Sequence, residues 1–161
     1  MDKNIELFLL ESNKIEGVYD EDSLKQAKLA WKYLMTQKTL TVGVILKTHK
    51  ILMLHQKLRP NEKGYFRTCE VMIGQRFGLS WFKIKNVINE WLDDVKVSIK
   101  IPGEDGKHIK NDHIEYERIH PFVDGNGRTG RLFYQWERLK SGLPIVIIYE
   151  KDRQEYYKWF K

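Results

Sequence analysis

The sequence HPFVDGNGRTGR, from His120 to Arg131, decides how this chain folds and what it does. Its twelve residues include one histidine, one aspartate, one asparagine, three glycines and two arginines. An ordinary solvated Asn-Gly turn would explain part of it, but not this density of charged groups. The residue types instead indicate a site for a metal-bound polyphosphate with a general base beside it.

The histidine has the features of that base. Proline disfavours helical geometry in the residue before it, so the helix leading into this stretch is predicted to end near His120, which precedes Pro121. The carboxyl end of a helix carries partial negative charge and favours a protonated imidazole. We therefore expect His120 to titrate near neutral pH, as suits a general base.

The remaining polar residues suit phosphate and metal. Asp124 lies in the loop, where one carboxylate together with substrate phosphates is a usual set of ligands for Mg²⁺. The run Gly125-Asn126-Gly127 lets backbone amides approach an anion closely, and a helix is predicted to start here. Arg128 and Arg131 are three residues apart and share one face of its first turn.

This stretch resembles the signature of the Fic family, His-x-Phe-x-Asp/Glu-Gly-Asn-Gly-Arg-x-x-Arg, at every fixed position. The lead-in 113–119 and the segments 64–67 and 71–74 also resemble the family's preceding helix and its hairpin, so the resemblance covers roughly residues 5–160. It implies one Fic domain over 1–161, a mainly α-helical bundle with a small β-hairpin flap over the active-site loop. Family members mostly transfer AMP from ATP to a hydroxyl of a protein.

The resemblance also implies a role for each residue. His120 would be the catalytic base, Phe122 the core anchor of the loop, and Asp124 the Mg²⁺ ligand. The nucleotide ATP would be bound by Gly125, Asn126, Gly127, Arg128 and Arg131. The flap would align a Ser, Thr or Tyr side chain of a target protein, with Met72, Ile73 and Gly74 facing that target or the nucleotide.

An inhibitory segment is expected at the start of the chain. Ile5, Phe8, Leu9 and Ser12 have the spacing of an amphipathic helix that stops at Gly17. Glu16 would lie in its last turn, where the helix dipole disfavours a carboxylate, so we expect a cationic partner, Arg131. The sequence from Ser12 to Gly17 resembles the Fic inhibitory motif, in which the glutamate pairs with the second signature arginine. This divides the chain into an inhibitory helix, 1–17, and a catalytic core, 18–161.

Two other functions remain as alternatives. A nucleotide-binding regulator of the same fold would not need His120, and a Doc-like phosphotransferase toxin would carry lysine where Gly127 stands. The net charge of +6 favours polyanionic ligands, but the basic residues are scattered and nucleic acid is not expected as a partner. The single cysteine, Cys69, and the lack of a signal or membrane-spanning pattern indicate a cytoplasmic protein without membrane contact. Self-modification and homo-oligomers stay open.

The rest of the chain is predicted from periodicity and capping. Helices are expected over 21–38, capped by Asp20 or Asp22, over 41–58, capped by Thr41, from Ser80 onward and over 151–160. A hairpin is expected over 65–79, a strand over 97–101, a turn over 102–106, and a cap at Asn111 or Asp112 before the signature. Segment 145–149 is either extended or helical.

Four further residues lie on or near these elements. His49 and His55 are expected to have structural roles, because no paired ligand spacing accompanies them. His113 lies two helical turns before His120 and matches a family position, and we expect it to serve packing rather than chemistry. Arg67 is a further candidate for a contact to phosphate.

Overall fold

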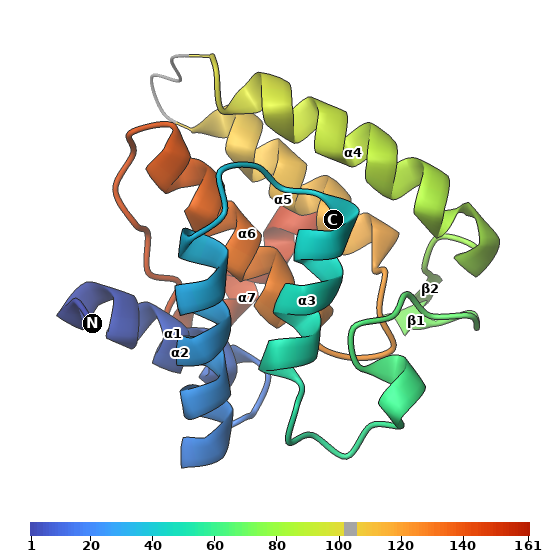
Figure 1. Ribbon diagram of the computed structural model, residues 1–161, viewed down its shortest axis with the longest axis horizontal. Coiled ribbons are helices and arrows are strands. Elements are labelled where there is room, and N and C mark those ends of the chain that lie inside the picture. Colours follow the sequence, from blue (N-terminus) through green and yellow to red (C-terminus); the bar gives the residue numbers. More distant parts are fainter. Residues whose placement is uncertain (102–105) are drawn as a thin grey trace.

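The computed structural model describes residues 1–101 and 106–161, which form a helical bundle with one small β-hairpin (Figure 1). Its helices are α1 (Lys3–Ile15), α2 (Glu21–Met35), α3 (Val42–Leu52), α4 (Ile84–Ser98), α5 (Lys107–Ile119), α6 (Asn126–Lys140) and α7 (Arg153–Tyr157). The strands are β1 (Met72–Ile73) and β2 (Arg76–Phe77). The predicted fold class, mainly α with a small hairpin, is confirmed. In the described part of the chain, no helix is long and apolar enough to cross a membrane.

Helix α6 is the element that the others surround. It packs against α5 and also contacts α1, α2 and α3, and Figure 1 shows α2 and α3 side by side in front of it. The rings of Trp91, Tyr116 and Phe133, from α4, α5 and α6, meet with centroids 5.1–6.2 Å apart. Burial of such side chains contributes about 1.5–3 kcal/mol each. The start of α6, where the signature lies, is therefore fixed from several sides.

The N-termini of α2 and α3 follow the predicted capping. Asp20 Oδ1 accepts a hydrogen bond from the backbone N–H of Ser23 at 2.7 Å, and Thr41 Oγ1 accepts one from Val44 at 3.2 Å. Of the two aspartates proposed for α2, Asp20 is the cap, whereas Asp22 lies within the first turn. These bonds satisfy donors that the helix itself cannot.

Helix α3 is shorter than predicted. It was expected to continue to about Leu58 but ends at Leu52. The backbone N–H of Gly64 donates to Nδ1 of His49 at 2.9 Å, so the chain has to turn back toward α3 after the helix ends. Leu58 still packs against the core, from this connecting segment rather than from a helix, which explains its apolar character.

The predicted strand over 97–101 is wrong. Helix α4 continues to Ser98, and Ile99 still donates its N–H to the carbonyl of Val95 at 3.1 Å. Val95 and Ile99, four residues apart, continue the apolar stripe of the helix against the core, whereas Val97 and Ile101 are exposed. Packing of the helix therefore outweighs the intrinsic strand preference of these β-branched residues. Of the predicted turn over 102–106, residues 102–105 lie outside the described residues.

The predicted cap of α5 is also wrong. The helix begins at Lys107, directly after Gly106, whose φ of 73° is left-handed. Asn111 and Asp112 therefore lie inside the helix. Asp112 is 7% exposed, and burial raises the pKa of its carboxyl while the hydroxyl of Ser98 opposes that rise. Its side chain serves the packing of α5 rather than its start.

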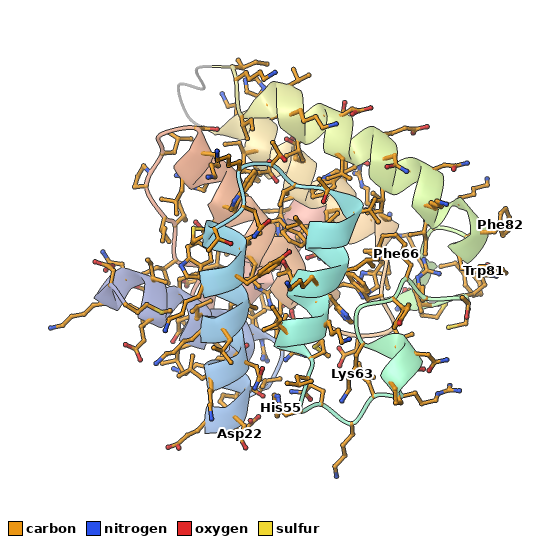
Figure 2. The ribbon with its side chains drawn as sticks, in the orientation of Figure 1. Asp22, His55, Lys63, Phe66, Trp81 and Phe82 are labelled. Atoms are coloured by element: carbon orange, nitrogen blue, oxygen red, sulfur yellow. The ribbon has the colours of Figure 1, made fainter. Side chains whose placement is uncertain are left out.

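The hairpin is smaller than the predicted range 65–79. Pairing is limited to Met72 opposite Phe77 and Ile73 opposite Arg76. Figure 2 shows the side chains of Trp81 and Phe82 projecting at the edge of the molecule, where the chain leaves the hairpin. A two-residue ladder is too short to be stable alone, so the position of the flap depends on how its two ends are attached.

The C-terminal segment leaves the bundle in irregular structure and ends in short turns. Residues 143–149 form neither helix nor strand, and the side chain of Gln135 bonds both backbone groups of Val146 at 2.5 and 3.0 Å. The predicted helix over 151–160 is divided into η3 (Glu150–Asp152), α7 and η4 (Lys158–Phe160). These turns place aromatic side chains beside α5 and α6.

Candidate functional site

The loop between α5 and α6 is closed by the amide of Asn126. Its Oδ1 accepts from the N–H of Phe122 and its Nδ2 donates to the carbonyl of Phe122, both at 2.8 Å. The side chain of Asn126 is thereby committed to the loop, which leaves only its backbone N–H for a nucleotide. The ring of Phe122 is fully buried, as the resemblance implied. These two hydrogen bonds and the buried ring fix the loop to the core.

His49 supports the loop from α3. Its ring stacks on Phe122 with centroids 3.7 Å apart, and its Nε2 donates to the carbonyl of Asp124 at 2.8 Å. Burial lowers the pKa of His49 to about 4, so the ring is neutral. His49 therefore has the structural role predicted for it.

His120 lies at the end of α5 in a left-handed conformation, with φ 50° and ψ 63°. Among the described residues it is the only non-glycine with positive φ. Its Nδ1 lies 3.2 Å from the carbonyl of Glu117, which can only accept a hydrogen bond. The ring proton therefore sits on Nδ1, and Nε2 carries a free lone pair.

The pKa of His120 is shifted in the direction opposite to the predicted one. The helix terminus was expected to favour the imidazolium, but burial lowers the pKa of His120, and the bond to Glu117 does not reverse that effect. The side chain is only 22% exposed. Desolvation of the charged ring thus outweighs the helix dipole, and the ring is a neutral base at pH 7.

A pocket of about 480 Å³ lies beside His120. The flap residues predicted to face a target or nucleotide, Met72, Ile73 and Gly74, line this pocket. Aromatic side chains of the C-terminal turns line it too: Tyr156, Tyr157 and Phe160. Arg76 of the flap donates to the carbonyl of Phe160 at 2.9 Å. The flap and the C-terminal turns therefore meet across one pocket.

The first turn of α6 has the properties of an anion site. The leading N–H groups of a helix have no intrahelical acceptors. Arg128 is 3% exposed, and its Nε and Nη1 are buried without a hydrogen-bond partner. Its Nη2 reaches only Met53 Sδ at 3.3 Å and lies 3.7 Å from Asp124 Oδ2. Buried donors without acceptors are costly. Arg128 does not line the pocket, so an anion at this turn would satisfy these donors only if the guanidinium turned toward it.

Asp124 stands at the outer side of the loop. Its side chain is 57% exposed, and its Oδ1 accepts from the N–H of Gly125 at 2.6 Å. No group of three or more His, Cys, Asp or Glu side chains that could hold a metal exists in the described part of the chain. A single carboxylate beside an anion site fits Mg²⁺ that shares its other ligands with phosphates and water.

The second signature arginine already has partners from α1. Arg131 donates from Nε to Ser12 Oγ at 2.9 Å, and from Nη2 to the carbonyl of Ser12 at 2.9 Å and to Glu16 Oε1 at 2.7 Å. A Cβ on Gly127 would lie 2.2 Å from that oxygen of Glu16. The carboxylate of Glu16 thus covers the start of α6, where an anion would bind.

Glu117 belongs to the site but was not singled out from the sequence. Its side chain is 13% exposed and lines the pocket, and its Oε2 lies 4.0 Å from Nδ1 of His120. Burial raises the pKa of Glu117 to about 7, Arg131 opposes this rise and Glu16 adds to it. The feature of the sequence that could have identified Glu117 is its position three residues before His120, since residues with this spacing share a helix face.

The prediction that Arg67 contacts phosphate is wrong, because its guanidinium binds backbone carbonyls. It is 2% exposed, and its Nε donates to the carbonyl of His120 at 2.7 Å. His113 is also structural: it is 1% exposed, its Nε2 lies 2.8 Å from the hydroxyl of Tyr156, and burial lowers its pKa to about 3.

A neutral imidazole beside an anion-binding helix start is the arrangement of group-transfer enzymes in which a hydroxyl attacks phosphorus. The model of the Fic/DOC family matches residues 39–137, more than half of the chain, and the chain belongs to this family.

Its relatives carry names that agree with this assignment. The chain is 29% identical over 154 residues to "Protein adenylyltransferase Fic" of Nematostella vectensis, covering 94% of this chain and 34% of the relative. It is 32% identical over 153 residues to the protein of that name from Drosophila melanogaster, covering 91% and 30%. The chain therefore spans about a third of the length of these relatives.

Solved structures show the same fold. A Fic domain containing signaling protein from Bacteroides thetaiotaomicron aligns with a TM-score of 0.80 at 18% identity, covering 96% of this chain and 70% of that one. Fic-1 from C. elegans (residues 134–508) aligns with a TM-score of 0.73 at 22% identity, covering 98% and 55%.

Proposed function

We propose that this chain is a protein adenylyltransferase, which transfers AMP from ATP to a Ser, Thr or Tyr hydroxyl of a target protein. The observation that carries the proposal is that His120, with a free Nε2, lines the same pocket as Gly127 and Arg131 of the anion site. Attack of a hydroxyl on phosphorus needs a base and an anion site at one place. The names of the relatives support AMP as the transferred group.

The reaction follows from these positions. The triphosphate would lie along the first turn of α6, with its charge balanced by backbone N–H groups and by Arg128. His120 Nε2 removes the proton of the target hydroxyl, whose oxygen forms a bond to the α-phosphorus. The bond from the α-phosphorus to the oxygen of the β-phosphate breaks, and pyrophosphate leaves. Mg²⁺ bound at Asp124 would neutralise phosphate charge.

The contact between Glu16 and Arg131 supports an inhibitory role for residues 1–17 over a core of residues 18–161. Glu16 Oε1 both bonds Arg131 and covers Gly127. A phosphate at that place would meet a like charge and would lack Arg131 as a partner. A charge-assisted hydrogen bond contributes about 1.5–3 kcal/mol, so its removal should release activity by about 10- to 150-fold.

The test compares the wild type with Glu16→Gly, using ATP labelled on the α- or the γ-phosphate, with Mg²⁺ and cell lysate. We expect α-label on a lysate protein or on the chain itself, increased in Glu16→Gly. Glu6→Gly is the matched control, because Glu6 lies on α1, the helix that Glu16 directly follows, and pairs with Lys28, away from the pocket. Transfer of γ-label beyond that of the lysate without this chain would instead establish a phosphotransferase of the Doc kind.

A second variant tests the base. His120→Ala in the Glu16→Gly background should lose transfer and keep nucleotide binding, because the anion site belongs to α6 rather than to α5. Undiminished transfer by this variant would reject His120 as the base. Nucleotide binding without any label transfer in the Glu16→Gly parent would indicate a nucleotide-binding regulator.

A further inference from the structure

The guanidinium of Arg67 bonds four backbone carbonyls. Nε donates to His120 at 2.7 Å, and Nη2 donates to Ile119 at 3.3 Å, both at the carboxyl end of α5. Nη1 donates to Cys69 at 2.7 Å, and Nη2 also donates to Leu79. Cys69 precedes the hairpin and Leu79 follows it. One side chain therefore joins the base-bearing end of α5 to both ends of the flap.

This arginine has no close carboxylate partner in the described part of the chain. The nearest acidic oxygen, Oε2 of Glu70, is 4.0 Å away on a side chain that is 45% exposed. A buried cation is costly unless its donors are satisfied, so the carbonyls are the groups that hold it here. Two of them are the unpaired carbonyls at the end of a helix, where positive charge is favourable.

The conformation of His120 depends on such support. A left-handed φ in a histidine costs free energy and persists only where the surroundings enforce it. The carbonyl of His120 bonds Arg67 Nε, and the next carbonyl, of Pro121, accepts from the backbone N–H of Arg67 at 2.9 Å. Arg67 thus contacts the chain on both sides of the peptide bond that follows the base.

We propose that Arg67 is a positioning residue for transfer: it holds His120 in its left-handed conformation and ties both ends of the flap to the same point. The catalytic base and the target segment on the flap then keep one relative position. The part that concerns the flap rests on the proposed function, whereas the part that concerns the conformation of His120 does not. The anion site is independent of Arg67, because Asn126 and Phe122 hold the start of α6.

Replacing Arg67 by lysine tests whether the positive charge or the planar geometry of the guanidinium is what positions His120. An ammonium group keeps the positive charge, but a single nitrogen cannot replace a planar fork that bonds three segments. We expect Arg67→Lys, in the Glu16→Gly background, to reduce the rate of label transfer at saturating ATP by about 100-fold, the effect of a misplacement of about 1 Å. The nucleotide Kd should stay within about twofold, since α6 is not touched.

The matched control is Arg138→Lys in the same background. Arg138 is also buried, at 7% exposure, and its Nε donates to a carbonyl, that of Pro144, at 2.8 Å. It does not line the pocket. This variant measures the general effect of replacing a buried arginine, and its transfer rate should match that of the parent. An equal loss in both lysine variants would overturn the proposal.

A crystal structure of Arg67→Lys reads the effect without any activity. We expect the φ of His120 to leave the left-handed region, and an unchanged φ and ring position would overturn the proposal even if the Glu16→Gly parent transfers no label.

If the lysine variant does not fold, the variant Gly78→Ala tests the proposal instead. Its Cβ would stand 3.3 Å from Nη2 of Arg67 and 3.2 Å from Cγ2 of Val71, so both side chains have to shift by a few tenths of an ångström. Transfer should fall at unchanged Kd, and undiminished transfer would overturn the proposal.

Discussion

Replacing Glu117 by glutamine removes a carboxyl group that the fold keeps protonated near neutral pH. The side chain lies on the last turn of α5, is 13% exposed, and its Oε1 is buried without a partner. Burial raises its pKa from the ordinary 4.5 to about 7, an effect that Arg131 opposes and Glu16 adds to. The amide has nearly the same shape and cannot ionise, so the variant isolates the effect of this one charge.

The sign and size of the effect follow from linkage. Between pH 4.5 and about 7 the folded chain retains a proton on Glu117 that the unfolded chain releases. The free energy of unfolding therefore decreases as the pH rises through this window and is constant above it. A tenfold change in proton binding corresponds to about 1.4 kcal/mol, so the full decrease is about 3 kcal/mol. The unfolding free energy of Glu117→Gln does not undergo this decrease, so its Tm at pH 8 should exceed that of the wild type by about 6–12 °C.

The assay is urea unfolding of both proteins from pH 4.5 to 8.5, with the difference in unfolding free energy plotted against pH. Glu115→Gln is the control, because Glu115 lies on the same helix but is 54% exposed and pairs with Arg118. The difference in unfolding free energy between Glu115→Gln and the wild type should stay small and should not change with pH. If Glu117 were instead an ionised partner of Arg131, Glu117→Gln would be the less stable protein at pH 8, and the reasoning would be wrong.

Three further predictions concern the loop and the anion site. Phe122→Ala should lower the free energy of unfolding by about 3–5 kcal/mol, measured by urea unfolding, because the ring is fully buried. Gly125→Ala should weaken nucleotide binding in calorimetry, since φ is 84° and a Cβ would lie 2.8 Å from Sδ of Met53; equal affinity would refute this. Glu16→Gln should strengthen the binding of ATP more than that of ADP, because only the outermost phosphate is expected to need Arg131; equal gains would contradict that assignment.

The parts of the fold that could be predicted are those that local chemistry decides. Apolar residues at helical spacing placed the helices, and Asp20 and Thr41 capped two of them as expected. Errors arose where a distant contact decides the local structure. Helix α3 ends at Leu52, and the chain then turns back so that Gly64 donates to His49, a contact that no pattern within 41–58 reveals. The burial of Asp112 likewise turned a good capping residue into an interior one.

The signature located the candidate site, but the sequence did not predict the protonation of its side chains. Helix-terminus reasoning predicted that the imidazolium of His120 is favoured and that the ring titrates near neutral pH. The direction of the shift was wrong, because burial, which lowers the pKa, cannot be inferred from the neighbouring residues in the sequence. Glu117 was missed for the same reason. A glutamate on the last turn of a helix is commonly solvated, and only packing against α6 raises its pKa to about 7.

The arginines around the loop show most clearly why partners, rather than residue types, assign roles. Arg67 is bound to carbonyls, Arg131 to Ser12 and Glu16, and Arg128 keeps buried donors without acceptors. An anion that reached Arg128 would meet the unpaired Nε and Nη1, whereas at Arg131 it would have to displace a carboxylate, and at Arg67 it would release the end of α5. Under the proposed function the same type of side chain would therefore serve binding, regulation and positioning, according to the bonds that each arginine already makes.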